Sequence, residues 1–143
     1  MNVIDRIVID TNVLVSALRS RQGASFALLE QVGTGRFDHV LTVPLVMEYE
    51  SVLLRPGMVP IPVAAVQDVI DYLCSTGIHQ DIHFLWRPKL PDPKDDMVLE
   101  AAANAGCQVI VTHNVRDFAS AAALGVRALT PAQFLNKSKE RRT

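Results

Sequence analysis

Hydrophobic residues recur along the chain at two spacings, and the alternation between them predicts the order of the elements. Short apolar runs rich in β-branched residues are typical of buried strands, whereas apolar positions three and four apart predict amphipathic helices. Buried strands are expected at about residues 6–10, 37–42, 108–112 and 126–129, with at most one edge strand in the connector 78–87. Helices are expected at 13–18, 24–32, from 43 onward, around 66–73, at 95–105, shortly after 114 and from 131 onward. This alternation predicts a three-layer α/β/α sandwich around a central, mainly parallel sheet of four to five strands.

A single domain is expected from the length and from the breaks between elements. The 143 residues suffice to bury a full core, and neither a repeat nor a linker divides them. The stretch 55–62, which is rich in proline, is a break between helices. We therefore predict one domain over 1–143, with a core at about 6–135 and a basic C-terminal tail at 136–143.

The composition argues against a disordered chain and against a membrane-spanning one. Hydrophobic residues make up 49% of the chain and charged residues 20%, which is far from disorder, and no apolar run approaches the roughly 20 residues that span a bilayer. The N-terminus lacks the layout of a signal peptide, and Cys74 and Cys107 lack metal-ligand spacing. We expect buried free thiols and a cytoplasmic location. With a net charge of −1 the protein as a whole does not attract nucleic acid. The positive charge is local, at Arg19, Arg21 and the C-terminal tail.

Asp10 is the first candidate for chemistry because it ends the first predicted strand. Ligands of open α/β sheets bind at the carboxyl ends of strands, and an unpaired carboxylate is costly to bury. Two structural explanations stay open at this point. Asp10 is also suited to cap the following helix or to begin a turn.

Two further acids are placed on apolar helix faces by their spacing. Glu48 lies three residues after Leu45 and four before Val52, so it shares their inward face. Asp95 lies three residues before Val98 and is also expected to point inward. A carboxylate on an apolar face needs a partner or loses its charge.

The other acids near Asp95 have simpler explanations. Asp96 is expected to turn toward Glu100 and water, and Asp92 is a candidate helix cap. The helix dipole favours acids in the first turn. That effect explains an acid-rich helix start but not an acid on the apolar stripe.

Asn114 and Asp117 follow the strand predicted at 108–112 and lie three residues apart. The pair fits a variant capping box, with Asp in place of the usual Glu, nearly as well as it fits a functional site. Both interpretations stay open.

Acidic and amide side chains therefore follow several predicted strands: Asp10, Glu48, Asp95, Asn114 and Asp117. Parallel strands bring their carboxyl ends to one edge of the sheet, so these side chains can converge. Clustered carboxylates repel one another, and a hard cation such as Mg²⁺ or Mn²⁺ relieves the repulsion. The sequence thus predicts a divalent metal site that can activate water against a phosphodiester.

Four short segments carry these side chains and span about residues 6–130. They are 10–16 (DTNVLVS), 44–49 (PLVMEY), 92–102 (DPKDDMVLEAA) and 112–118 (THNVRDF). In this order and spacing the chain resembles the PIN-domain ribonucleases, in particular the VapC-like toxin components of bacterial toxin–antitoxin pairs. The first and third segments are the most specific part of the resemblance.

The resemblance implies a PIN-like fold and Mg²⁺- or Mn²⁺-dependent hydrolysis of single-stranded or looped RNA, with 5′-phosphate and 3′-hydroxyl products. It assigns Asp10, Glu48 and Asp95 as metal-binding catalytic acids. Asn114 stands where many relatives carry Asp, so either Asn114 or Asp117 completes the acidic site. Polar neighbours are expected to orient the carboxylates or water: Thr11, Asn12, Ser16, Asp92 and Thr112.

Partners follow from the charge and from the resemblance. With acids in the site, RNA must be held by local cations, and we expect Arg19 and Arg21 to contribute, together with the basic tail. The resemblance also implies a cognate antitoxin whose C-terminal segment docks near the active site, and frequent homodimers.

Three other functions are compatible with the sequence. Asn114 favours a PIN fold that binds RNA or a partner without cutting, which a test for metal-dependent cleavage would distinguish. The segment 10–13 is faintly similar to the nucleophile motif of haloacid-dehalogenase-type phosphatases, which have a second Asp where Asn12 stands and form a covalent phospho-aspartate. A housekeeping nuclease would carry the same acids as a toxin.

Overall fold

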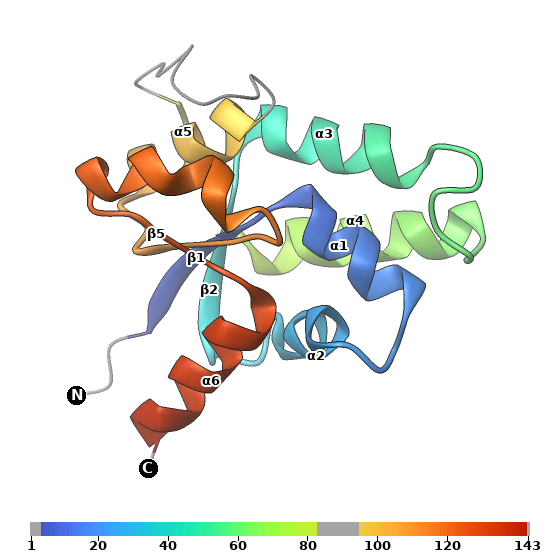
Figure 1. The fold of residues 1–143 in the computed structure, drawn as a ribbon. Helices are drawn as coiled ribbons and strands as arrows, with labels where there is room; N and C mark the ends of the chain where they lie inside the picture. The colour runs from blue at the N-terminus through green and yellow to red at the C-terminus, as the bar shows by residue number, and fades with distance from the viewer. Residues whose placement is uncertain (1–3, 83–94, 143) are drawn as a thin grey trace.

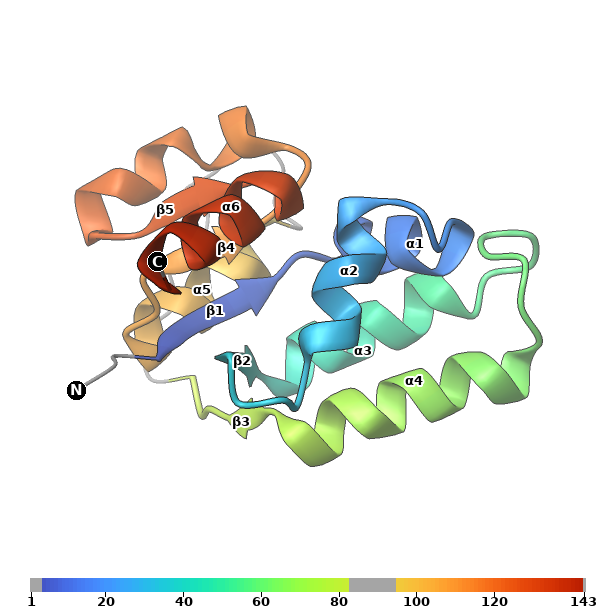
Figure 2. The same cartoon turned by 90° about the horizontal axis from the view of Figure 1, so that it is seen from below.

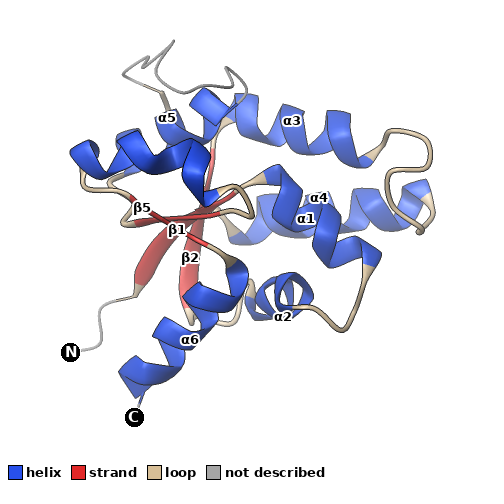
Figure 3. Ribbon diagram, in the orientation of Figure 1, coloured by secondary structure: helices blue, strands red, loops and turns tan. Residues whose placement is uncertain are grey.

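A five-stranded parallel sheet forms the centre of the fold (Figures 1 and 3). The computed structural model describes residues 4–82 and 95–142, and the side chains of 138–142 are outside this description. The strands are β1 (Asp5–Ile9), β2 (Phe37–Leu41), β3 (Ile78–His79), β4 (Val109–Val111) and β5 (Arg127–Leu129). They lie in the order β3-β2-β1-β4-β5, and every neighbouring pair is parallel.

Helices cover both faces of this sheet. They are α1 (Thr11–Arg19), α2 (Ala24–Gln31), α3 (Val43–Leu53), α4 (Val63–Thr76), α5 (Asp96–Ala105), the 3-10 element η2 (Val115–Leu124) and α6 (Pro131–Arg142). Helix α5 packs against β1, β2 and β4 on one face, while α2 and α6 lie on the other, as Figure 2 shows. Helices α1, α3 and α4 extend beyond the carboxyl ends of β1 and β2 (Figure 2). The predicted three-layer α/β/α sandwich is confirmed.

The central position of β1 explains its continuous apolar sequence. Ile7 pairs with His39 of β2 on one side and with Val109 of β4 on the other. Because α5 covers one face and α2 and α6 the other, Ile7, Val8 and Ile9 are all fully buried. Strands buried on both faces lack polar alternation.

Three expectations about the rest of the chain can be compared with the structure. The last helix, α6, runs to Arg142 and so includes residues 136–142 of the predicted tail. Both cysteines are free thiols, with Cys107 buried and Cys74 only half-buried, and burial raises the pKa of Cys107 to about 12. No helix within 4–82 or 95–142 is long and apolar enough to cross a membrane.

His39 makes the stability of the sheet depend on pH. It is 2% exposed, and its Nε2 lies 3.1 Å from the Thr76 hydroxyl oxygen at the end of α4. Burial lowers the pKa of His39 to about 4 from an ordinary value of 6.5, with a smaller lowering by His79 and an opposing effect of Asp38. Between these two pH values the unfolded chain binds the proton and the folded chain does not. Stability should therefore fall as the pH drops from 6.5 toward 4.

We predict that His39→Gln reduces this acid sensitivity. The histidine should cost the wild type about 2 kcal/mol of unfolding free energy between pH 7 and pH 5, because 1.5 pH units below 6.5 correspond to that energy. Urea unfolding of both proteins at the two pH values measures the difference. Equal losses in the variant and the wild type would contradict the prediction.

Candidate active site

Asp10 directly follows the central strand and is held there by bonds from β4. Its backbone N–H donates to the Val111 carbonyl at 2.9 Å, and its side chain is 7% exposed. Asp10 occupies the N-cap position of α1, but its carboxylate makes no capping hydrogen bond. It accepts a 2.7 Å hydrogen bond from the Thr112 hydroxyl instead. Asp10 therefore occupies the cap position without the usual capping bond, and a helix cap alone does not explain its carboxylate.

Thr112 ties the end of β4 to the end of β1. Its hydroxyl oxygen accepts from the Asn114 backbone N–H at 3.0 Å while its proton is donated to Asp10. The next residue, His113, donates its backbone N–H to the Asn12 side-chain oxygen at 3.3 Å. Thr112 thus contacts the Asp10 carboxylate directly, whereas Asn12 connects α1 to the residue that follows Thr112.

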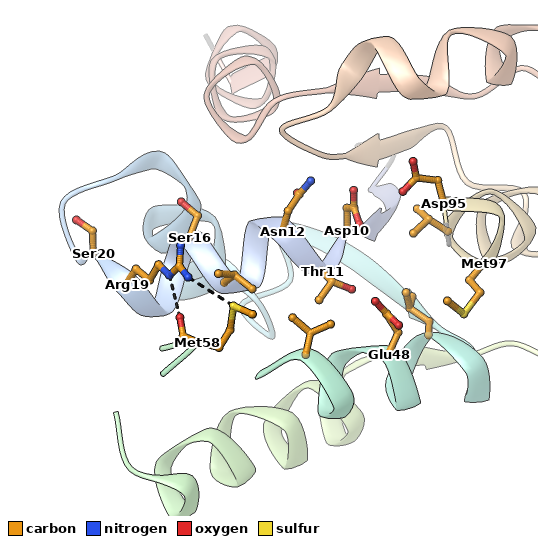
Figure 4. Close-up of a pocket in the computed structure, with 14 residues that line it drawn as sticks. Asp10, Thr11, Asn12, Ser16, Arg19, Ser20, Glu48, Met58, Asp95 and Met97 are labelled. Atoms are coloured by element: carbon orange, nitrogen blue, oxygen red, sulfur yellow. Dashed lines mark hydrogen bonds between the residues drawn. The ribbon is translucent and has the colours of Figure 1, made fainter. Parts of the chain in front are cut away.

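The three principal acids line one cleft of about 500 Å³ (Figure 4). Asp10 comes from the end of β1, Glu48 from α3 and Asp95 from the start of α5. In Figure 4 the labelled carboxylates of all three border the same space. Polar residues of α1 continue the lining: Thr11, Asn12 and Ser16. The fold therefore brings together acids that are separated by up to 85 positions.

The electrostatics of this cleft disfavour carboxylate charge. Burial raises the pKa of Asp10, and the nearby Glu48 carboxylate raises it further. The Thr112 hydroxyl, the Thr11 backbone N–H and the charge of His113 act in the opposite direction. Asp10 and Glu48 therefore repel each other, and a bound cation would relieve that repulsion.

These donors fit a magnesium-like ion better than a closed metal cage. No three His, Cys, Asp or Glu side chains of the described residues lie close enough together to enclose an ion. Mg²⁺ retains several waters and is usually held by one or two carboxylates together with substrate phosphates. Asp10, Glu48 and Asp95, which border one cleft, are such a donor set.

Asn114 and Asp117 are not in this cleft. They line an adjoining pocket of about 430 Å³ together with His113 and Arg116. The Asn114 side chain makes no capping hydrogen bond, so the capping-box explanation is not supported either. His113 lines this second pocket and still influences the Asp10 carboxylate, and its Nε2 lies 3.0 Å from the Ser25 hydroxyl oxygen of α2.

The expectation that Asp96 faces water is wrong. Asp96 and Glu100 share a face, as expected, but both are 0% exposed. Helix α5 contacts three strands and also α3 and η2, so it has little surface left for solvent. Small and apolar residues occur on several sides of α5 and could have predicted its burial, because helices that are apolar all round are usually buried. Asp92 lies outside the described residues.

The far end of the cleft carries a fixed cation. Arg19, in the last turn of α1, donates from Nε to the Met58 carbonyl at 2.8 Å, and its Nη2 lies 3.5 Å from the Met58 sulfur (Figure 4). Arg21 is exposed and is not among the described residues that line the cleft. Met58 and Met97, which also line it, were not identified from the sequence.

Comparison with known proteins shows similarity to a family model and to solved structures. The model of the PIN domain family matches residues 6–116. A chain in the crystal structure of VapBC2 from Rickettsia felis, bound to a DNA fragment from their promoter, is similar with a TM-score of 0.60 and 13% sequence identity. The similarity covers 87% of this chain and 98% of that chain, and at this identity it concerns the fold. No curated protein sequence matches the chain.

We predict that Asp10→Asn does not destabilise the metal-free protein at pH 7. The raised pKa of Asp10 means that the folded state holds the proton more tightly than the unfolded chain, so stability is lost as the pH rises from 3.8 through the folded-state pKa. Asparagine removes this loss and can still accept from Thr112.

Thermal unfolding in chelator at pH 7 and at pH 3 tests this prediction. The variant should equal or exceed the wild type at pH 7, and its relative advantage should shrink at pH 3. Glu50→Gln, which removes an exposed acid of the same α3 helix outside the cleft, is the matched control. A variant midpoint well below that of the wild type at pH 7 would contradict the electrostatic argument.

Proposed function

The chain belongs to the PIN domain family, and from this premise we propose that it is a divalent-metal-dependent endoribonuclease. PIN domains are generally nucleases. The observation that carries the proposal is the convergence of Asp10, Glu48 and Asp95 on one cleft from three different elements. Membership of this family leaves no support for the phosphatase alternative.

In this proposal each residue that lines the cleft has its own role. Asp10 and Glu48 would hold Mg²⁺ or Mn²⁺, with Asp95 completing the acidic set. The ion, when bound, would supply charge neutralisation at the phosphate and a lowered pKa for an attacking water. Thr112 fixes the direction of the Asp10 carboxylate through its 2.7 Å hydrogen bond, as outer-shell donors commonly do. Because Asp10 is buried, its repulsion with Glu48 is weakly screened and favours cation uptake.

The remaining candidates have separate roles in this proposal. Asn114 and Asp117 would reach only a second ion, bound toward the adjoining pocket that they line. Thr11 and Ser16 line the same cleft as the acids and would orient water. Asp92 stays a prediction from the sequence alone.

We further propose a toxin role with a cognate antitoxin, and a cytoplasmic location. The structural similarity to VapBC2 supports the first, because that structure is named for a VapB–VapC assembly on its own promoter DNA. The two free cysteines support the second, since a reducing compartment keeps thiols unpaired. A homodimer is part of the same proposal and rests on family resemblance.

One observation favours a binding module as the second candidate function. The described acids do not form a three-ligand cluster, and Asn114 replaces an acid that many relatives carry. Such a protein would hold RNA or a partner in the same cleft without hydrolysis.

We predict that Mn²⁺ stabilises the wild type. At an ion concentration 100 times the dissociation constant, mass action adds about 2.7 kcal/mol, which corresponds to roughly 5–10 °C in the unfolding midpoint for a chain of this size. Asp10→Asn and Glu48→Gln should lose most of this shift, whereas the control Glu50→Gln should keep it. Cleavage of a fluorescent single-stranded RNA should require the same ion and stop in chelator. An unshifted wild type would refute the metal site and leave the binding module ahead.

We predict that Arg19, rather than Arg21, contacts the RNA backbone. In an Asp10→Asn background, which separates binding from cleavage, Arg19→Ala should weaken RNA binding. It should also reduce the slope of log affinity against log salt by about 0.7, the value for one phosphate contact on a single strand. Arg21→Ala is the matched control, with a nearby exposed arginine outside the cleft. Identical salt slopes for the Asp10→Asn parent and for the same protein with Arg19→Ala would exclude the contact.

A further inference from the structure

Tyr49 connects the two segments that carry the repelling acids. It follows Glu48 in α3 and is 2% exposed. Its hydroxyl donates a hydrogen bond to the carbonyl of Ile9, the last residue of β1 and the neighbour of Asp10. A single buried contact therefore joins the residue after Glu48 to the residue before Asp10.

This contact lies where β1 and β2 stop pairing. Their parallel register runs from Asp5–Phe37 to Ile7–His39, and the chain turns into α3 soon after the end of β2. The Ile9 carbonyl lies two residues beyond the last pair, and the Tyr49 hydroxyl supplies its donor from α3. On the other side of β1, the Asp10 N–H is bonded to Val111. The end of β1 is thus fixed from both flanks.

The hydrogen bond from Tyr49 to Ile9 matters because the Asp10 and Glu48 carboxylates repel each other. The Glu48 carboxylate adds to the electrostatic cost of a charged Asp10, so contacts that keep α3 beside the end of β1 act against this repulsion.

We propose that Tyr49 is a positioning residue, whose hydroxyl holds Glu48 at the separation from Asp10 that a shared divalent ion requires. The inference rests on the proposed metal site. It adds to that site a residue that touches neither ion nor substrate.

The chain offers two controls for a test of this proposal. The Tyr72 hydroxyl of α4 also donates to a backbone carbonyl, that of Val32, at 2.9 Å, and neither residue lines the cleft. Tyr72→Phe removes the same chemical group, but Tyr72 is 48% exposed. Ile70→Val, at a buried position of α4, therefore serves as the control for lost stability.

The experiment measures the Mn²⁺ dissociation constant by electron paramagnetic resonance for the wild type, Tyr49→Phe and both controls, beside urea unfolding of each. We expect Tyr49→Phe to weaken Mn²⁺ binding about tenfold, as loss of an outer-shell partner commonly does, while both controls stay within twofold of the wild type. Replacement of Tyr49 by p-aminophenylalanine, which restores an N–H donor, should recover most of the affinity.

Four outcomes would overturn the inference. If the wild type binds Mn²⁺ and Tyr49→Phe stays within twofold of it, the positioning role is wrong and the proposed metal site stands. If Ile70→Val loses as much affinity as Tyr49→Phe, the effect is one of stability. If the wild type binds no Mn²⁺, the inference and the proposed function both fail. Should Tyr49→Phe not fold, the p-aminophenylalanine variant decides alone, and a loss of affinity there would count against the proposal.

Discussion

The central place of β1 in a parallel sheet is the constraint on which the site depends. Parallel pairing to β2 and β4 brings three strand ends to one edge, and Asp10 is the first residue past the middle one. Val111 and Thr112 reach Asp10 because β4 is paired in register with β1 up to its last residue. Glu48 of α3 and Asp95 at the start of α5 line the same cleft as Asp10.

At this edge of the sheet, the acids proposed to serve function lower the stability of the fold. A carboxylate that is 7% exposed beside a second carboxylate weakens the fold, while the same arrangement would favour the proposed cation. The surrounding hydrogen bonds limit the cost without removing the charge. The Thr112 hydroxyl donates to one oxygen of the Asp10 carboxylate, and the backbone N–H of Thr11 at the start of α1 also stabilises the carboxylate charge. Functional sites often retain such unfavourable local interactions.

The order of strands and helices was predictable because periodicity and run length encode it directly. Asp10 was identifiable for the same reason, since a polar residue at the end of a buried run is conspicuous. The burial of Asp96 was not, because helix periodicity assumes one buried face whereas α5 is covered on several sides. The contact of Arg19 with Met58 was also inaccessible, because it depends on the path that the stretch 55–62 takes back toward α1. Spacing likewise could not show that Asn114 faces a neighbouring pocket.

The hydrogen bond from Thr112 to Asp10 joins residues 102 positions apart, and this separation has a consequence for synthesis. On the ribosome, β1 and β2 are made long before β4, so the middle strand of the finished sheet is for a time an edge strand. During that interval Asp10 lacks both Val111 and Thr112. The acid edge is therefore completed only when nearly four-fifths of the chain has emerged. A truncated or stalled product would carry Asp10, Glu48 and Asp95 without the contacts from β4 that fix Asp10.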